Sequence, residues 1–194
     1  MRQVARPQDY SDYGPIHYIA LWQILRQIEA PVEDGVFVDF GAGLGRALLG
    51  AARLPFQRVL GIEFDPDLAN ATQENLDRAR DKGRFVCPEV EILRMDARNF
   101  EISDNATVLH FFNPFSGQLL ETVAENLVES LRKAPRAVDL FYANPWDFTR
   151  VVRETNVIPA HWIQSESIVP WPLYRRNNDG DHYRVYRIDS RKIS

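Results

Sequence analysis

Short β-rich runs alternate with amphipathic stretches along the chain, beginning at Val36. This alternation is typical of βαβ units, in which a helix connects two parallel strands. Ahead of it, apolar residues recur at helical spacing over Ile16–Glu29 and Pro31 follows, so a helix is predicted there. The predicted strands are Val36–Phe40, Arg58–Glu63, Val90–Met95, Thr107–Phe112 and Ala137–Tyr142.

Helices are predicted between these strands, where the apolar residues recur with a helical period. They cover Gly45–Leu54, Pro66–Lys82 and Ser116–Ala134, and another is predicted at Trp146–Glu154. The last two strand-like runs resemble an antiparallel hairpin, and they are Trp162–Val169 and Tyr183–Ile188. These elements predict an α/β fold in which one doubly wound, mostly parallel sheet of seven strands ends in a C-terminal antiparallel hairpin.

The composition is that of one globular domain. Of the 194 residues, 45% are hydrophobic, which is enough to fill a single core. The net charge of −4 excludes a general affinity for nucleic acid or anionic lipid, so any such binding must be local and a nucleic-acid partner is not expected. A single cysteine and the lack of a long apolar run predict a cytoplasmic protein without a membrane segment.

The most informative motif follows the first predicted strand and reads Asp39-Phe40-Gly41-Ala42-Gly43-Leu44-Gly45-Arg46. Glycines at this spacing allow a sharp turn from strand to helix and let a ligand lie against backbone N–H groups. The motif therefore indicates a nucleotide-type ligand, although a purely structural turn would also use these glycines. The dinucleotide fingerprint would need glycine where Arg46 stands, so a nicotinamide oxidoreductase is disfavoured.

Two acidic residues close the next two predicted strands. Glu63 lies 22 residues after Gly41, where a carboxylate can accept bonds from both hydroxyls of a ribose. Asp65 precedes Pro66 and is the more natural helix cap, so Glu63 is the better ligand. Asp96 can accept a bond from an adenine amino group, or it is an ordinary loop residue.

At this point the chain resembles the class I, Rossmann-like S-adenosylmethionine-dependent methyltransferases, over roughly residues 15–190. The resemblance is carried by VDFGAGLGR (Val38–Arg46), GIEFDP (Gly61–Pro66), RMDAR (Arg94–Arg98) and FFNPF (Phe111–Phe115). It implies residues 1–30 as an N-terminal lid segment and helix, and residues 31–194 as the methyltransferase domain, within one structural domain. The cofactor would be S-adenosylmethionine and the product S-adenosylhomocysteine.

The resemblance also assigns residues to the cofactor. Asp39, Gly41 and Gly43 would line its methionine end, Glu63 would hold the ribose, and Asp96 with the backbone of Ala97 would hold the adenine. Ala42, Phe64 and Asn113 are further cofactor contacts on this basis.

Asn113-Pro114-Phe115 follows the fourth predicted strand and is the candidate acceptor site. The Asn113 amide oxygen can accept a hydrogen bond from an acceptor N–H and so orient its lone pair, and Phe115 can stack on the acceptor. The motif looks like a shortened (Asn/Asp)-Pro-Pro-(Tyr/Phe) motif of amide and adenine nitrogen methyltransferases, but the second proline is missing; a simple turn is the alternative. Tyr10 and Tyr13 can form a lid or an aromatic wall, or simply pack.

The acceptor itself stays open. The glycine motif with GIEFDP looks like the non-SET histone-lysine methyltransferases and the small lysine methyltransferases of archaea and mitochondria, so protein lysine is the first hypothesis and a small molecule the second. The histidines have no metal-ligand spacing, so no metal is predicted. The rival class is a non-catalytic cofactor-binding subunit. The chain does not predict an oligomeric state.

Overall fold

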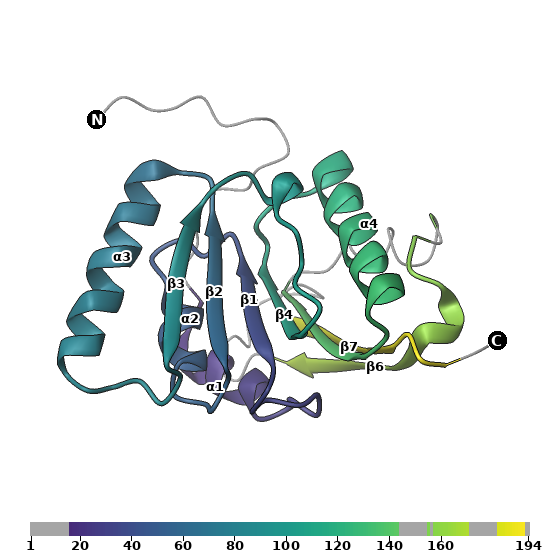
Figure 1. The fold of residues 1–194 in the computed structure, drawn as a ribbon, viewed down its shortest axis with the longest axis horizontal. Coiled ribbons are helices and arrows are strands. Elements are labelled where there is room, and N and C mark those ends of the chain that lie inside the picture. Colours follow the sequence, from purple (N-terminus) through teal and green to yellow (C-terminus); the bar gives the residue numbers. More distant parts are fainter. Residues whose placement is uncertain (1–15, 144–154, 156, 171–181, 193–194) are drawn as a thin grey trace.

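The architecture is that of an α/β domain built on one mixed sheet (Figure 1). The computed structural model describes residues 16–143, 155, 157–170 and 182–192. Within these residues the strands follow the order β3-β2-β1-β4-β5-β7-β6. Their bounds are β1 (Val36–Phe40), β2 (Arg58–Glu63), β3 (Glu89–Arg94), β4 (Ala106–Phe112), β5 (Ala137–Ala143), β6 (Ile163–Pro170) and β7 (His182–Asp189).

The first five strands are parallel, whereas β7 is antiparallel to both β5 and β6. The α-helices are α1 (Tyr18–Leu25), α2 (Arg46–Ala51), α3 (Pro66–Asp81) and α4 (Gly117–Lys133), and two short 3-10 helices are η1 (Ala97–Asn99) and η2 (Ala160–Trp162). The predicted seven-stranded sheet with its closing antiparallel hairpin is therefore confirmed.

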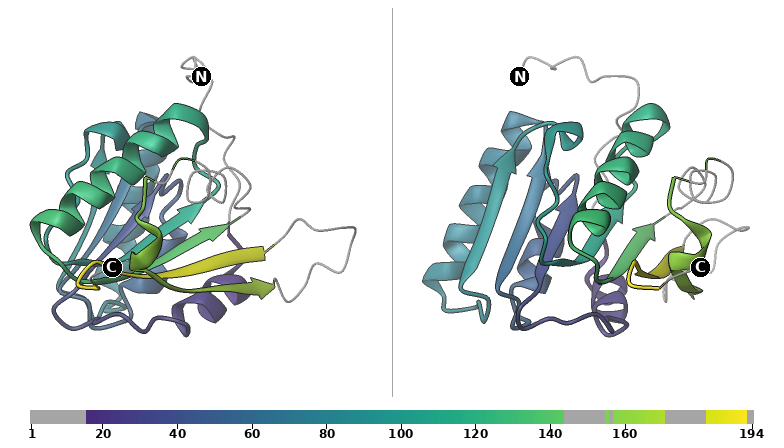
Figure 2. Two further views of the ribbon diagram at one scale, coloured as in Figure 1. Left: turned by 90° about the vertical axis from the view of Figure 1, so that its right-hand side faces the viewer. Right: turned by 45° about the vertical axis from the view of Figure 1, so that its right-hand side comes forward.

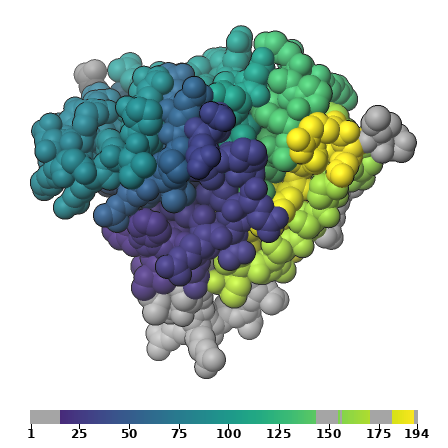
Figure 3. Space-filling model, turned by 60° about the horizontal axis from the view of Figure 1, so that its bottom comes forward, coloured from purple at the N-terminus to yellow at the C-terminus, as the bar shows by residue number. Residues whose placement is uncertain are grey.

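The two faces of the sheet are covered by different helices, because successive side chains of a strand point to opposite faces. Val36, Val38 and Phe40 pack into the core that contains the apolar face of α4, whereas Phe37 packs into the core formed with α1 and α2. Figure 2 shows α4 lying along one side of the sheet. Viewed from the end where the parallel strands begin, the N-terminal part of the chain, in purple, lies between α3 and the β6–β7 hairpin (Figure 3).

Two predicted helices are shorter in the structure. The helix predicted over Ile16–Glu29 ends at Leu25, because the backbone N–H groups of Glu29 and Ala30 donate to Asp139 Oδ2 at 2.5 and 2.9 Å. The helix predicted to reach Leu54 ends at Ala51, and a tighter turn with i to i−3 bonds follows. The helix predicted at residues 146–154 lies outside the described residues.

Candidate functional site

The residues from Gly41 to Gly45, here called the glycine loop, connect β1 to α2. All three glycines have positive φ, 74° at Gly41, 56° at Gly43 and 77° at Gly45, a conformation that side-chain-bearing residues rarely adopt. The N–H groups of Gly41 and Ala42 both donate to the Ile62 carbonyl of β2, at 2.9 and 3.1 Å. The loop is thus held at the carboxyl ends of two adjacent parallel strands, where open α/β sheets bind ligands.

Glu63, the last residue of β2, bonds directly to this loop. One carboxylate oxygen accepts from the Gly43 N–H at 2.8 Å, and the other accepts from the Asp65 N–H at 2.9 Å. The residue is 8% exposed, so the carboxylate is held in one orientation. Because an ionised carboxylate has about four acceptor positions, these two bonds are compatible with further bonds from ribose hydroxyls. Asp65 caps α3 as predicted, accepting from the N–H groups of Asp67 and Leu68.

The Asn113-Pro114 segment lies against the glycine loop. A Cβ atom placed on Gly41 would lie 2.4 Å from Pro114 Cβ, so the ends of β1 and β4 are in direct contact there. Asn113 is exposed and has a φ of 48°, the one positive value among the described non-glycine residues. Asn113 is therefore an exposed residue directly before the proline that contacts the loop.

Phe115 is placed differently from the expectation. Its ring is 2% exposed and lies edge-on to Phe40 and Phe111, with centroids 6.5 and 6.1 Å apart. Its carbonyl accepts a bond from the Tyr142 hydroxyl at 3.1 Å. In this arrangement the ring supports the Asn113 segment from the core, and it would have to leave the core to stack on an acceptor.

Asp39 belongs to a buried polar chain that crosses the sheet. Its Oδ1 lies 2.6 Å from His110 Nδ1, and His110 Nε2 lies 3.0 Å from the Tyr183 hydroxyl. All three residues are at most 3% exposed. Burial, together with the nearby Asp39 carboxylate, raises the pKa of Tyr183 well above its usual value. Asp39 thus points toward His110, which is a hydrogen-bonded residue of the core.

The adenine candidates lie at the end of β3. The Asp96 carboxylate caps η1 by accepting from the Arg98 N–H at 2.9 Å, and it also pairs with the Arg98 guanidinium at 2.6 Å. An adenine amino group would share this carboxylate with Arg98. Ala97 is buried at the start of η1, and Phe64 is half-buried between Glu63 and the α3 cap.

The sequence analysis missed two α3 side chains that hold the glycine loop from behind. Thr72 Oγ1 donates to the Gly43 carbonyl at 2.5 Å, and Asn75 Nδ2 donates to the Leu44 carbonyl at 3.0 Å. A Cβ atom on Gly45 would lie 2.7 Å from Thr72 Cγ2, so the helix and the loop are closely packed. A signal was available, because Thr72 continues the buried helical period of Ala69 and Leu76.

Two predicted site residues, Tyr10 and Tyr13, lie outside the described residues. Among the residues that are described, no three His, Cys, Asp or Glu side chains come together as metal ligands would. No helix in the described part of the chain is both long and apolar enough to cross a membrane.

Comparison with known proteins gives one sequence match of limited extent. No protein-family model matches the chain. A ribosomal protein L11 methyltransferase from Pseudoalteromonas atlantica is 38% identical over 68 residues, which make up 34% of this chain. The match spans only 23% of that protein's length.

Solved structures match over nearly the whole chain. An RNA methyltransferase from Salinibacter ruber in complex with S-adenosyl-L-homocysteine has a TM-score of 0.54 and 23% identity, covering 91% of this chain and 93% of that one. A precorrin-6y C5,15-methyltransferase from Geobacter metallireducens has a TM-score of 0.61 and 15% identity, with 92% and 93% covered. A precorrin 8w decarboxylase from Methanobacterium thermoautotrophicum has a TM-score of 0.60 and 17% identity, with 91% and 92% covered. At these identities the likeness establishes the fold, which is the Rossmann-like fold of class I methyltransferases.

Proposed function

We propose that this protein is a class I methyltransferase that binds S-adenosylmethionine across the carboxyl ends of β1, β2 and β3. The observation that carries the proposal is the bond from the Gly43 N–H to the Glu63 carboxylate, at 2.8 Å. It joins the loop that would face the methionine end of the cofactor to the residue that would hold its ribose. The solved complex of the Salinibacter ruber protein with S-adenosyl-L-homocysteine supports this choice of cofactor.

In this proposal the residues of the chain position the cofactor. The glycine loop would line the methionine end, Glu63 would accept the ribose hydroxyls, and Asp96 with the Ala97 backbone would face the adenine, with Ala42 and Phe64 alongside. Asp39 is only 3% exposed, so it would affect the cofactor indirectly, through its bond to His110 and through the shape of the glycine loop. When bound, S-adenosylmethionine contributes an activated methyl group on its sulfonium.

Asn113 would act on the acceptor. The residue is exposed, and Pro114, which follows it, lies against Gly41. The Asn113 amide oxygen can accept a hydrogen bond from an attacking nitrogen and align that nitrogen's lone pair. Alignment is the main requirement, since the electrophile is already activated, and an amine that becomes desolvated in the site is more readily neutral. Phe115 would hold this segment from the core, and Tyr13 remains a proposed part of a lid or aromatic wall.

The acceptor we propose first is a protein lysine, and the second is a small molecule. The partial match to a protein named for ribosomal protein L11 supports a protein acceptor. The solved precorrin methyltransferase supports a small molecule, and the solved RNA methyltransferase makes RNA a third possibility that the same assay must cover.

The test is transfer of an isotopically labelled methyl group. The protein would be incubated with labelled S-adenosylmethionine and with protein, RNA and small-molecule fractions of a cell extract, and the labelled species identified by mass spectrometry. We expect label in one fraction, and less label with a Glu63→Ala preparation at the same cofactor concentration. Tight binding of S-adenosylmethionine without transfer to any fraction would favour the non-catalytic subunit. A thermal shift with NAD in place of S-adenosylmethionine would contradict the proposed cofactor.

A further inference from the structure

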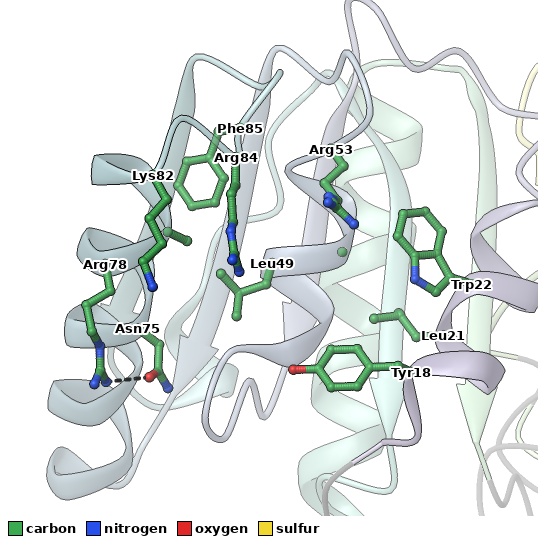
Figure 4. Close-up of a pocket in the computed structure, with 12 residues that line it drawn as sticks. Tyr18, Leu21, Trp22, Leu49, Arg53, Asn75, Arg78, Lys82, Arg84 and Phe85 are labelled. Carbon is green, nitrogen blue, oxygen red and sulfur yellow. Dashed lines mark hydrogen bonds between the residues drawn. The ribbon is translucent and has the colours of Figure 1, made fainter.

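A second concave surface lies away from the glycine loop, between α1, α2 and α3. It has a volume of about 440 Å³, which is within the range of ligand pockets. Figure 4 shows side chains of α1 and α3 facing one another across α2. We call this surface the basic groove, because the charged side chains that line it are Arg53, Arg78, Lys82 and Arg84.

The charge of the groove is opposite to that of the whole chain. No acidic residue lines it, although the net charge of the protein is −4. Of the four cations, Arg78 bonds to Asn75 Oδ1 at 2.7 Å, and none of the four forms an ion pair with a described carboxylate. Four like charges so close together repel each other, and an anionic ligand would relieve that repulsion.

Helix termini do not account for this cluster. Cations are favoured near the carboxyl end of a helix, and both α2 and α3 end at the groove. Each helix end carries about half a negative charge, so two ends contribute about one. The four cations exceed this by about three charges, which leaves the groove clearly positive.

Aromatic side chains are interleaved with the cations. Tyr18 is 53% exposed, and Trp22 and Phe85 are partly exposed in the same groove. The Arg53 guanidinium lies 5.6 Å from the Trp22 ring centroid, and the Arg46 guanidinium lies 5.1 Å from that of Tyr18. Such contacts hold the rings in place, and a ring held at the surface is a stacking platform for a nucleobase.

We propose that the basic groove binds a segment of single-stranded nucleic acid, with its phosphates on the cations and a base on the exposed ring of Tyr18. Cations alone would fit any anion, but rings and cations together match a nucleotide chain, which has a flat base and a phosphate at every unit. Because the net charge of the whole protein is −4, nucleic acid can bind only where positive charge is concentrated, and this groove is such a place. The proposal concerns a docking surface and does not rest on methyl transfer.

The test is fluorescence anisotropy with a labelled RNA of about ten nucleotides, without S-adenosylmethionine. The groove variant is Lys82→Glu/Arg84→Glu, in which both residues are exposed. The matched control is Arg132→Glu/Lys133→Glu, which makes the same change of net charge at the carboxyl end of α4, on the other side of the sheet. We expect the groove variant to weaken binding about 10-fold or more and the control to leave it nearly unchanged. In wild type, log Kd should rise with log salt at a slope of about 2 to 3, because up to four phosphates are neutralised.

A second pair of variants tests stacking. Tyr18→Ala should weaken RNA binding about 5- to 150-fold, whereas Tyr18→Phe, which keeps the ring, should bind nearly as wild type does. If the groove variant and the control variant weaken RNA binding equally, the proposal is overturned, because only the overall charge of the protein would then matter. Adenosine monophosphate or polyglutamate binding as tightly as the RNA would also overturn it, in favour of a free nucleotide or of an unspecific anion site. Each result is independent of whether the protein transfers a methyl group.

Discussion

Glu63 is the residue on which the proposed cofactor site most depends. We expect Glu63→Ala to weaken binding of S-adenosylhomocysteine by about 1.5 to 3 kcal/mol, which is about 10- to 150-fold in Kd, since hydrogen bonds to a charged group are lost. The loss also frees the Gly43 N–H, to which the carboxylate bonds. Titration calorimetry measures the change, with the exposed Glu125→Ala on α4 as a control. Unchanged affinity in a folded Glu63→Ala protein would remove this residue from the site.

A variant of Asn113 can distinguish an effect on catalysis from an effect on cofactor binding. Because its φ is 48°, glycine is the substitution that removes the side chain without adding backbone strain. We expect Asn113→Gly to leave cofactor affinity nearly intact and to lower kcat/KM by about 10- to 1000-fold, through loss of the bond that aligns the acceptor. Calorimetry and turnover on one preparation give both values. If the variant turns over as fast as wild type, Asn-Pro-Phe is only a turn.

In the glycine loop, Gly41 is required both by its positive φ and by the close contact of the loop with Pro114 at the end of β4. Gly41 and Gly83 both have positive φ, but a Cβ on Gly41 would collide with Pro114, whereas a Cβ on Gly83 meets nothing within 4 Å. Gly83→Ala should therefore lower the free energy of unfolding by about 1 to 2 kcal/mol, the cost of a left-handed residue. Gly41→Ala should lose about 1 to 3 kcal/mol more, since Pro114 must also move. Denaturant unfolding of both variants measures this, and equal losses would mean that the two segments do not press on each other.

Helix α3 positions the same loop through Thr72. Thr72→Val keeps the shape of the side chain but removes the donor to the Gly43 carbonyl, so we expect a loss of about 1 to 3 kcal/mol in unfolding free energy and weaker cofactor binding. The control is Thr122→Val on α4, whose hydroxyl bonds a carbonyl of its own helix. That change should cost less than about 0.5 kcal/mol. Similar losses in both variants would show that the bond from α3 to the loop is dispensable.

On the scale of the whole molecule, the chain from Asp39 through His110 to Tyr183 joins β1 and β4 to the antiparallel strand β7. The pKa of Tyr183 is raised in the folded protein, so this tyrosine keeps its proton at a pH where the unfolded chain releases it. Its contribution to stability is therefore complete below about pH 10 and is lost as the pH rises further toward the folded-state pKa.

The prediction compares wild type with Tyr183→Phe across pH. Between pH 7 and pH 9 the variant should be less stable by a constant amount of about 1 kcal/mol, because the bond to His110 is lost. Above about pH 10 this difference should shrink or reverse, by at most about 1.4 kcal/mol per pH unit. Urea unfolding at several pH values measures it, with Tyr18→Phe at the surface as the control. A difference that stays constant up to about pH 11 would contradict the raised pKa.

The sequence by itself determined the features that depend on local order along the chain. Strand and helix periods follow from backbone geometry, so β2 was predicted at its observed bounds, Arg58–Glu63. The same holds for the turn built from glycines and for the Asp65 cap, whose partners are two and three residues away. The proposed role of Glu63 was also predicted from the sequence, from the number of residues between it and the first glycine and from its place at the end of a strand.

Tertiary structure decided which side chains meet, because strand order brings together residues that are far apart in sequence. Asp39 and His110 are 71 residues apart, and His110 and Tyr183 are 73 apart, yet the strand order brings them into one buried chain, which reaches from β1 and β4 past β5 to β7. Phe115 lies in the core instead of at the acceptor because Phe40 and Phe111 lie beside it there. The basic groove exists only where three helices converge on one face of the sheet, so no segment of the sequence contains it. Local periodicity depends on residues that are close in sequence, so the sequence alone reveals it. The burial of a side chain and the charge of a site depend on all the residues around them, and these come together only when the chain folds.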